Sequence, residues 1–253
     1  MSAPLVAVAH GSRDPRSAET VRRLLNVVRS VRPELDVREA FLDLSAPSLG
    51  EVLDSVYSDG HRQGVVVPLL LGHAYHASVD IPEAVAEARR RNPGLSVRVS
   101  GVLGPDPRLR AAAWRRLLHT GVDLGDTGMG VVLAGAGSAH PPANRLVAEV
   151  AESWRRRTAW AGVVPAFAAA SEPDVPTAVE RLRAAGARRF AVGSWFLAPG
   201  RLPDRVIERA LEHVSEPLLA EPMGDDHDVA ELVVGRYESA LDRPLAALGP
   251  EGR

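Results

Sequence analysis

Histidine and acidic side chains follow three short apolar runs in the first half of the chain. His10 comes directly after LVAVA, in the stretch HGSRDP, and Asp43 follows the run that ends in FL. A third apolar run leads into HAYHA at 73–77. Imidazole is the commonest metal ligand and titrates near neutrality, and a carboxylate can orient it. The set could hold a divalent metal ion or perform acid–base chemistry, although spacing alone leaves structural loop histidines an equal alternative.

The elements that would position these residues follow a βαβ pattern. Short Val-, Leu- and Ala-rich runs alternate with stretches of helical periodicity, which is typical of a parallel sheet covered on both faces. We therefore predict an α/β fold. The predicted strands cover 5–9, 37–42, 64–71, 96–102, 130–135, 162–168, 189–197 and 217–221, and the predicted helices cover 17–31, 48–58, 81–91, 143–156, 175–185 and 203–214.

The chain contains an internal duplication. GSRDP at 11–15 matches GSAHP at 137–141, and the 27 residues from Phe41 match those from Phe167 at the same offset of 126. The offset falls to 121 where DIPEAV (80–85) pairs with RLPDRV (201–206). We expect two similar half-domains, each a parallel sheet flanked by helices. The first covers residues 1–122 and carries the active site, and the second, degenerate one covers 128–253.

The duplication serves as an internal control on function. Residues that the halves share should serve the fold, whereas a reactive side chain present in one half only is a better functional candidate. His10 aligns with Ala136, and Asp43 aligns with Ala169. The drop in offset falls on HAYHA, so that His73, Tyr75 and His76 have no counterpart. These positions lie at the carboxyl ends of predicted strands, the edge where open parallel sheets bind ligands.

Composition excludes several classes of protein. The 253 residues include no cysteine, which removes disulfides, thiolate metal sites and a cysteine nucleophile. All 30 basic residues are arginine, so lysine Schiff bases and the phosphate-binding P-loop lysine are excluded. A net charge of -2 argues against a general nucleic-acid binder. No apolar run is long enough to span a bilayer and no basic leader is present. We expect a cytoplasmic monomer that contacts neither nucleic acid nor membrane.

Three motifs in order carry a resemblance to a known family. HGSRDPRS, FLDLSAPSL and PLLLGHAYHASVDIP together resemble the class II tetrapyrrole chelatases of the sirohydrochlorin chelatase (CbiX and SirB) type. The resemblance covers nearly the whole chain, because full-length members also have two related half-domains. It implies ATP-independent insertion of Co²⁺ or Fe²⁺ into sirohydrochlorin, in cobalamin or sirohaem biosynthesis. Ni²⁺ and Zn²⁺ are possible substitutes in vitro, and no nucleotide or other cofactor is implied.

The resemblance assigns roles to individual residues. The two active-site histidines of the family correspond to His10 and His76, which we expect to bind the metal and accept the pyrrole protons. The acidic residue corresponds to Asp43, where the family often has glutamate, and we expect it to orient an imidazole or relay a proton. His73 is an addition to the family segment. We expect Ser12, Arg13, His73 and Tyr75 to contact the carboxylate-rich substrate.

Two alternatives stay open. A metal- or tetrapyrrole-binding protein could deliver its cargo without catalysing insertion, and would bind stoichiometrically without turnover. A histidine-dependent phosphatase would use the same His10, although HGSRDP lacks the arginine that directly precedes the histidine in such enzymes. A further run, GDDHD at 224–228, could suggest a metal site. We interpret it instead as acidic residues at the start of a helix, where they complement the helix dipole.

Overall fold

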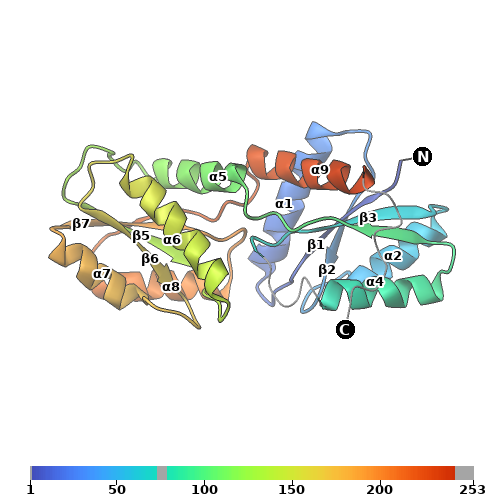
Figure 1. The fold of residues 1–253 in the computed structure, drawn as a ribbon, viewed down its shortest axis with the longest axis horizontal. Helices are drawn as coiled ribbons and strands as arrows, with labels where there is room; N and C mark the ends of the chain where they lie inside the picture. The colour runs from blue at the N-terminus through green and yellow to red at the C-terminus, as the bar shows by residue number, and fades with distance from the viewer. Residues whose placement is uncertain (1, 73–78, 243–253) are drawn as a thin grey trace. The chain divides into compact units, whose positions relative to one another are not determined.

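The chain folds into two compact units. The computed structural model describes residues 2–72 and 79–242 (Figure 1). Unit 1 comprises Met1–Gly104 and Asp225–Arg253, and unit 2 comprises Pro105–Gly224. Each unit holds a four-stranded parallel sheet flanked by helices. The predicted α/β class and the internal duplication are thereby confirmed.

Unit 1 has the strand order β2-β1-β3-β4. The chain leaves the central strand β1 for β2 on one side and then returns past it to β3 on the other side. The elements of this unit are β1 (Leu5–Ala9), α1 (Pro15–Val31), β2 (Val37–Phe41), α2 (Leu49–Ser58), β3 (Gln63–Pro68), α4 (Asp80–Arg91), β4 (Ser96–Val99) and α9 (His227–Leu241).

Unit 2 repeats this topology with the order β6-β5-β7-β8. Its central strand β5 pairs with β6 and β7 in the register that the offset of 126 requires, since Leu5↔Val37 corresponds to Val131↔Val163. The elements are α5 (Pro107–Leu118), β5 (Met129–Gly135), α6 (Pro141–Arg155), β6 (Gly162–Phe167), α7 (Val175–Ala184), β7 (Arg189–Ser194), α8 (Arg201–His213) and β8 (Leu218–Leu219).

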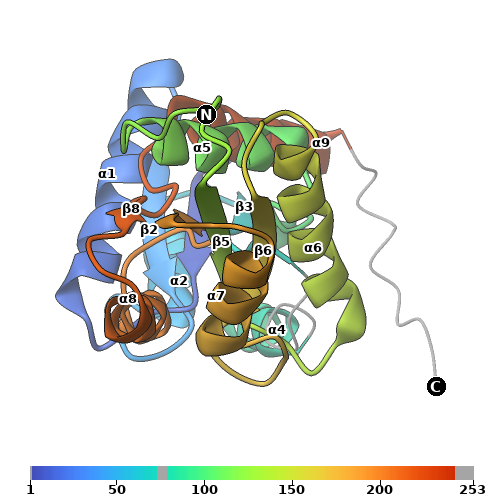
Figure 2. The ribbon, with the colours of Figure 1, turned by 90° about the vertical axis from the view of Figure 1, so that its left-hand side faces the viewer.

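Apolar strands and amphipathic helices form the hydrophobic core of each unit. Strands β1 and β5 are buried along their whole length, as expected for central parallel strands covered on both faces. In unit 2, α5 and α6 cover one face of the sheet while α7 and α8 cover the other (Figure 2). In unit 1, α1 and α9 lie together, and α2 and α4 pack on the opposite face.

Element ends differ from the prediction by a few residues for local reasons. Helix α1 begins at Pro15, two residues before the predicted start, because proline suits the first helical position and the Asp14 carboxylate caps the helix. Helix α6 likewise begins at Pro141. Strand β4 ends at Val99 and β7 at Ser194, so both are shorter than predicted.

The last helix of each sequence repeat belongs to the opposite unit. Helix α5 follows β4 in the chain but packs in unit 2, where Trp114 contacts Trp154 of α6 at a ring-centroid distance of 5.3 Å. Helix α9 follows β8 but packs on α1 and β3 of unit 1. There, the Arg236 guanidinium donates to the carbonyls of Val102 and Leu103. The compact units therefore exchange one helix relative to the expected 1–122 and 128–253 boundaries.

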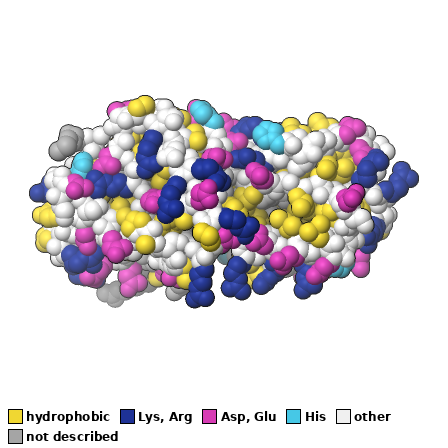
Figure 3. Space-filling model, turned by 180° about the vertical axis from the view of Figure 1, so that it is seen from behind, with side chains coloured by type: hydrophobic (Ala, Val, Ile, Leu, Met, Phe, Trp, Pro, Cys, Tyr) yellow, Lys and Arg dark blue, Asp and Glu magenta, His cyan; other side chains and the backbone are white. Residues whose placement is uncertain are grey.

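The surface of the described residues has no strongly one-signed face in the view of Figure 3. Arginine and acidic side chains are interspersed there, in keeping with the net charge of -2. Within 2–72 and 79–242, no helix combines the length and the apolar character needed to cross a membrane.

Removal of the Tyr237 hydroxyl should weaken the packing of α9 against the rest of unit 1. Buried Tyr237 donates its hydroxyl to the Ala3 carbonyl at 2.7 Å, and burial raises the pKa of this phenol, which keeps it protonated as a donor. We expect Tyr237→Phe to lower the free energy of unfolding by about 1 kcal/mol, the net value of one such hydrogen bond. Denaturant unfolding measures this. The control is Tyr57→Phe, since no hydrogen bond among the described residues involves that hydroxyl; equal losses in both variants would contradict the expectation.

Candidate functional site

The predicted site lies at the topological switch point of unit 1. Strands β2 and β3 flank β1 on opposite sides, so the loops after β1 and β3 diverge at the carboxyl edge of the sheet. In open α/β sheets this crevice is where ligands bind. His10 is the first residue after β1, and Asp43 comes two residues after the end of β2. The topology thus brings two of the predicted chemical positions to one edge.

A backbone hydrogen bond joins His10 to Asp43. The Asp43 N–H donates to the His10 carbonyl at 2.9 Å, which extends the pairing of β1 with β2 into the two loops. Both residues are exposed. The Asp43 carboxylate accepts from the Leu44 N–H through Oδ1 at 2.7 Å, and Leu44 has a positive φ of 59°. Asp43 therefore also stabilises its own turn, while Oδ2 has no hydrogen-bond partner among the described residues.

Gly11 allows the two loops to approach each other. Its φ is +94°, a conformation that side chains disfavour. A Cβ atom at this position would lie 1.7 Å from the Asp43 carbonyl oxygen. Only glycine fits between the loops that carry His10 and Asp43.

Ser12 is held in the turn by Ser45. The Ser12 N–H donates to the Ser45 hydroxyl at 3.1 Å, and that hydroxyl donates to the Ser12 carbonyl at 2.9 Å. The Ser12 hydroxyl accepts from the Asp14 N–H at 3.0 Å. Ser12 thus has a structural role beside its predicted contact with substrate. Sequence reasoning missed Ser45; the serine shared at 45 and 171 of the two repeats is the signal that could have identified it.

Arg13 is exposed beside the turn, and its guanidinium forms no salt bridge within the described part of the chain. Asp14 pairs instead with Arg16, whose Nε lies 3.0 Å from Oδ1. That hydrogen bond holds the pKa of the Asp14 carboxyl below its usual range, so Asp14 stays ionised as the cap of α1. Arg13 therefore stays exposed in the turn, three residues after His10 in the chain.

The remaining predicted residues, His73, Tyr75 and His76, lie outside the described residues. Their flanks are fixed on both sides. The Leu69 N–H, directly after β3, donates to the Val8 carbonyl of β1 at 2.8 Å. The chain is described again from Val79, where α4 begins one residue later. The segment that contains these three residues therefore starts from the strand beside β1.

Unit 2 builds the same turn without the reactive side chains. The Ala169 N–H donates to the Ala136 carbonyl at 3.1 Å, as Asp43 does to His10. Gly137 has φ +81°, and its Cβ would lie 1.8 Å from the Ala169 carbonyl oxygen. The backbone of this turn therefore forms without a histidine or an acid, although the Asp43 carboxylate adds a hydrogen bond to the Leu44 N–H in unit 1.

The GDDHD run forms the start of α9, as interpreted from the sequence. The Asp226 carboxylate accepts from the Asp228 N–H at 2.9 Å and caps the helix. One donor atom each from His227, Asp228 and Glu231 also lie within 4.8 Å of one another. These groups sit at a helix N-terminus, where the dipole disfavours a cation.

Known proteins are similar to this chain in sequence and in fold. A sirohydrochlorin ferrochelatase of Priestia megaterium is 27% identical over 92% of this chain and 89% of its own length. A sirohydrochlorin cobaltochelatase of the same organism is 25% identical, over 93% and 79% of the two lengths. Among solved structures, SirB from Bacillus subtilis with Fe³⁺ superposes with a TM-score of 0.78 at 24% identity and covers 96% of each chain.

The family assignment rests on a match that runs through both repeats. The family model described as CbiX matches residues 4–120 and again 130–240. The match includes the His10 and Asp43 turns of the first repeat and their alanine counterparts in the second. The chain therefore belongs to the CbiX family.

Proposed function

We propose that this protein is a sirohydrochlorin chelatase, an enzyme that inserts Co²⁺ or Fe²⁺ into sirohydrochlorin without ATP. One observation carries the proposal: two copies of one turn differ in that the first has His10 and Asp43 where the second has alanines. The relatives with these two activities support the reaction class. In the proposal, the protein works as a cytoplasmic monomer and needs no nucleotide or resident cofactor, and the metal ion is its substrate.

The residues at the switch point suit the chemistry of metallation. The macrocycle must lose two pyrrole N–H protons while the metal ion exchanges water and protein ligands for ring nitrogens. A neutral imidazole can hold the ion, and after release the same lone pair can accept a proton. We assign both roles in sequence to His10, and to His76 on the strength of the family resemblance. Charge balances because one M²⁺ enters as two H⁺ leave.

Asp43 is proposed to act on the imidazole rather than on the metal. Its Oδ1 is engaged by the Leu44 N–H, and the aspartate side chain is one methylene shorter than the glutamate often found in the family. A carboxylate held beside an imidazole fixes its orientation and raises its basicity. Arg13 and Ser12 are proposed to meet carboxylates of the macrocycle at the rim.

Anaerobic metallation assays test the function directly. Purified protein is mixed with sirohydrochlorin and then Co²⁺ or Fe²⁺, without ATP, and the change in macrocycle absorbance is followed. We expect many turnovers per protein at a rate well above that of the uncatalysed reaction. Stoichiometric binding without turnover would identify a delivery protein instead. Hydrolysis of a phosphomonoester at an ordinary enzymatic rate would identify a phosphatase.

A further inference from the structure

The carboxyl edge of unit 2 carries a different set of charges from that of unit 1. Helices α4 and α8 begin at equivalent positions, Asp80 and Arg201, at the offset of 121. At the same offset Ala84 corresponds to Arg205. In the turn after the central strand, the ionised Asp14 corresponds to His140. An acid and a neutral residue of unit 1 are thus replaced by arginines on an otherwise equivalent scaffold.

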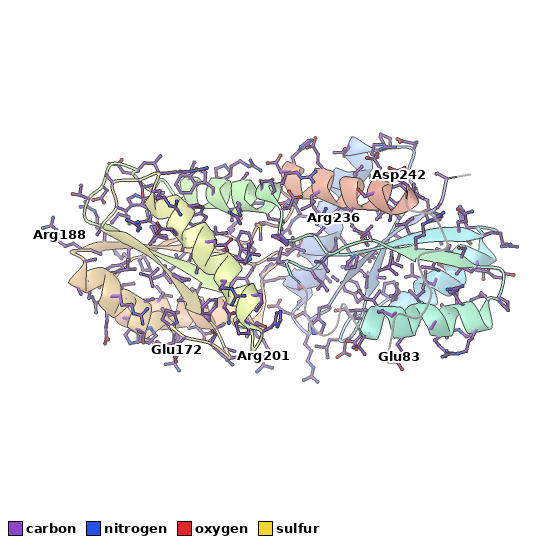
Figure 4. The ribbon with its side chains drawn as sticks, in the orientation of Figure 1. Glu83, Glu172, Arg188, Arg201, Arg236 and Asp242 are labelled. Carbon is purple, nitrogen blue, oxygen red and sulfur yellow. The ribbon has the colours of Figure 1, made fainter. Side chains whose placement is uncertain are left out.

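Both arginines lie at the start of α8, directly after the loop that leaves β7 at the switch point of unit 2. Strand β5 has β6 on one side and β7 on the other, so the loops after β5 and β7 diverge at the carboxyl edge. The loop after β7 runs from Trp195 to Gly200 and ends at Arg201, the first residue of α8 (Figure 4). This is the place equivalent to the His10 site, and it is where such a sheet binds its ligand.

Arg205 reaches the same edge from the next turn of α8. Its Nη1 donates to the Ala168 carbonyl at 3.3 Å, and Ala168 is the first residue after β6. Arg201 and Arg205 are both exposed. Among the described residues, neither guanidinium forms a salt bridge. Arg209, one turn further along α8, differs because it pairs with Glu212 at 3.0 Å.

We propose that Arg201 and Arg205 bind the carboxylate side chains of the tetrapyrrole substrate. The proposal rests on the proposed function, which requires the protein to handle a cation and a polycarboxylate together. The carboxyl edge of unit 2 has two exposed guanidinium groups, which match carboxylates in charge and geometry. Arg201 and Arg205 are therefore assigned to substrate binding.

Binding measurements without metal isolate this inference. Sirohydrochlorin is titrated into the parent, Arg201→Ala, Arg205→Ala and the double variant, with absorbance as the readout. We expect the Kd to rise about tenfold for each arginine removed, a typical loss for a charge-assisted hydrogen bond. The turnover number at saturating substrate should change little, so that the effect appears in KM. Arg209→Ala is the matched control and should leave Kd unchanged.

Two further readouts separate carboxylate recognition from a general structural effect. Added salt should weaken binding to the parent more than binding to the double variant, because fewer ion pairs remain to be screened. A macrocycle with esterified carboxylates should bind parent and double variant equally. An unchanged Kd in the double variant, or an equal loss in Arg209→Ala, would overturn the inference.

The outcomes also distinguish this inference from the function on which it rests. If the parent metallates sirohydrochlorin while the double variant binds it normally, the chelatase function stands and the arginine site is wrong. If the parent binds sirohydrochlorin through these arginines without metallating it, the arginine site stands and the catalytic function is wrong.

Discussion

His10→Ala lowers the turnover number for metal insertion by about 100-fold or more, the usual range for loss of a positioned acid–base group. The same substitution removes a proposed ligand of the incoming ion, so weaker Co²⁺ binding should accompany the loss. The fold should be unaffected, because the exposed side chain leaves the core untouched and the backbone carbonyl that accepts from Asp43 remains. Ala136 already makes the equivalent hydrogen bond in unit 2.

Stopped-flow or steady-state absorbance of the macrocycle measures the turnover number, and thermal unfolding checks the fold. His140→Ala is the control, since that histidine is exposed in the second copy of the same turn. Imidazole added to the buffer should restore part of the metal-insertion activity of His10→Ala. It should leave the activity of the parent protein unchanged. Metallation by His10→Ala at the parent rate would remove His10 from the mechanism.

The sequence repeat was sufficient to predict most of the fold and the sheet edge at which His10 and Asp43 lie. Alternating apolar runs and helical stretches identified the strands, and the constant offset of 126 implied one topology used twice. That topology alone predicts that His10 and Asp43 lie at one edge of the sheet. A turn can be copied without its reactive side chains, and the structure shows that the turns at Ala136 and Ala169 share their backbone geometry with those at His10 and Asp43.

Contacts that depend on tertiary packing could not be predicted in the same way. The sequence repeat does not say on which sheet the helices α5 and α9 pack. Their exchange depends on partners distant in sequence, such as Tyr237 with Ala3 and Trp114 with Trp154. The two hydrogen bonds between the Ser12 backbone and the Ser45 hydroxyl could not be predicted for a related reason. A serine repeated at 45 and 171 marks the position, but it does not show which backbone groups of another loop the Ser45 hydroxyl contacts.

The change from Asp80 to Arg201 was visible in the aligned segments DIPEAV and RLPDRV. Its meaning required the sheet order, because only the position beside β5 and β7 makes the first residue of α8 part of a switch point. The residue types show a difference in charge between the two units. The sheet order adds that Arg201 lies at the edge where parallel sheets bind ligands.

Gly11→Ala should disable the site through the backbone alone. The added Cβ would lie 1.7 Å from the Asp43 carbonyl oxygen, about half a normal contact distance, and φ +94° is unfavourable for alanine. The loops that carry His10 and Asp43 must therefore move apart by more than an ångström. Displacement on that scale can cost about 100-fold in rate even when every catalytic side chain is present. We expect a loss of metal insertion comparable to that of His10→Ala.

Gly137→Ala provides the matched control for this experiment. Its Cβ would lie 1.8 Å from the Ala169 carbonyl oxygen at φ +81°, so the steric conflict and the backbone strain are nearly the same. Both variants should lose about 2 kcal/mol or more of unfolding free energy, from the unfavourable φ and the forced shift of the loop. The turnover number is measured at a temperature below the unfolding midpoints of both variants. Only Gly11→Ala should lose most of the metal-insertion turnover number, because unit 2 has alanines in place of His10 and Asp43. Equal losses of turnover in the two variants would mean that the first turn matters for stability and not for the placement of His10. Retained turnover in Gly11→Ala would mean that the approach of these two loops is not part of the reaction.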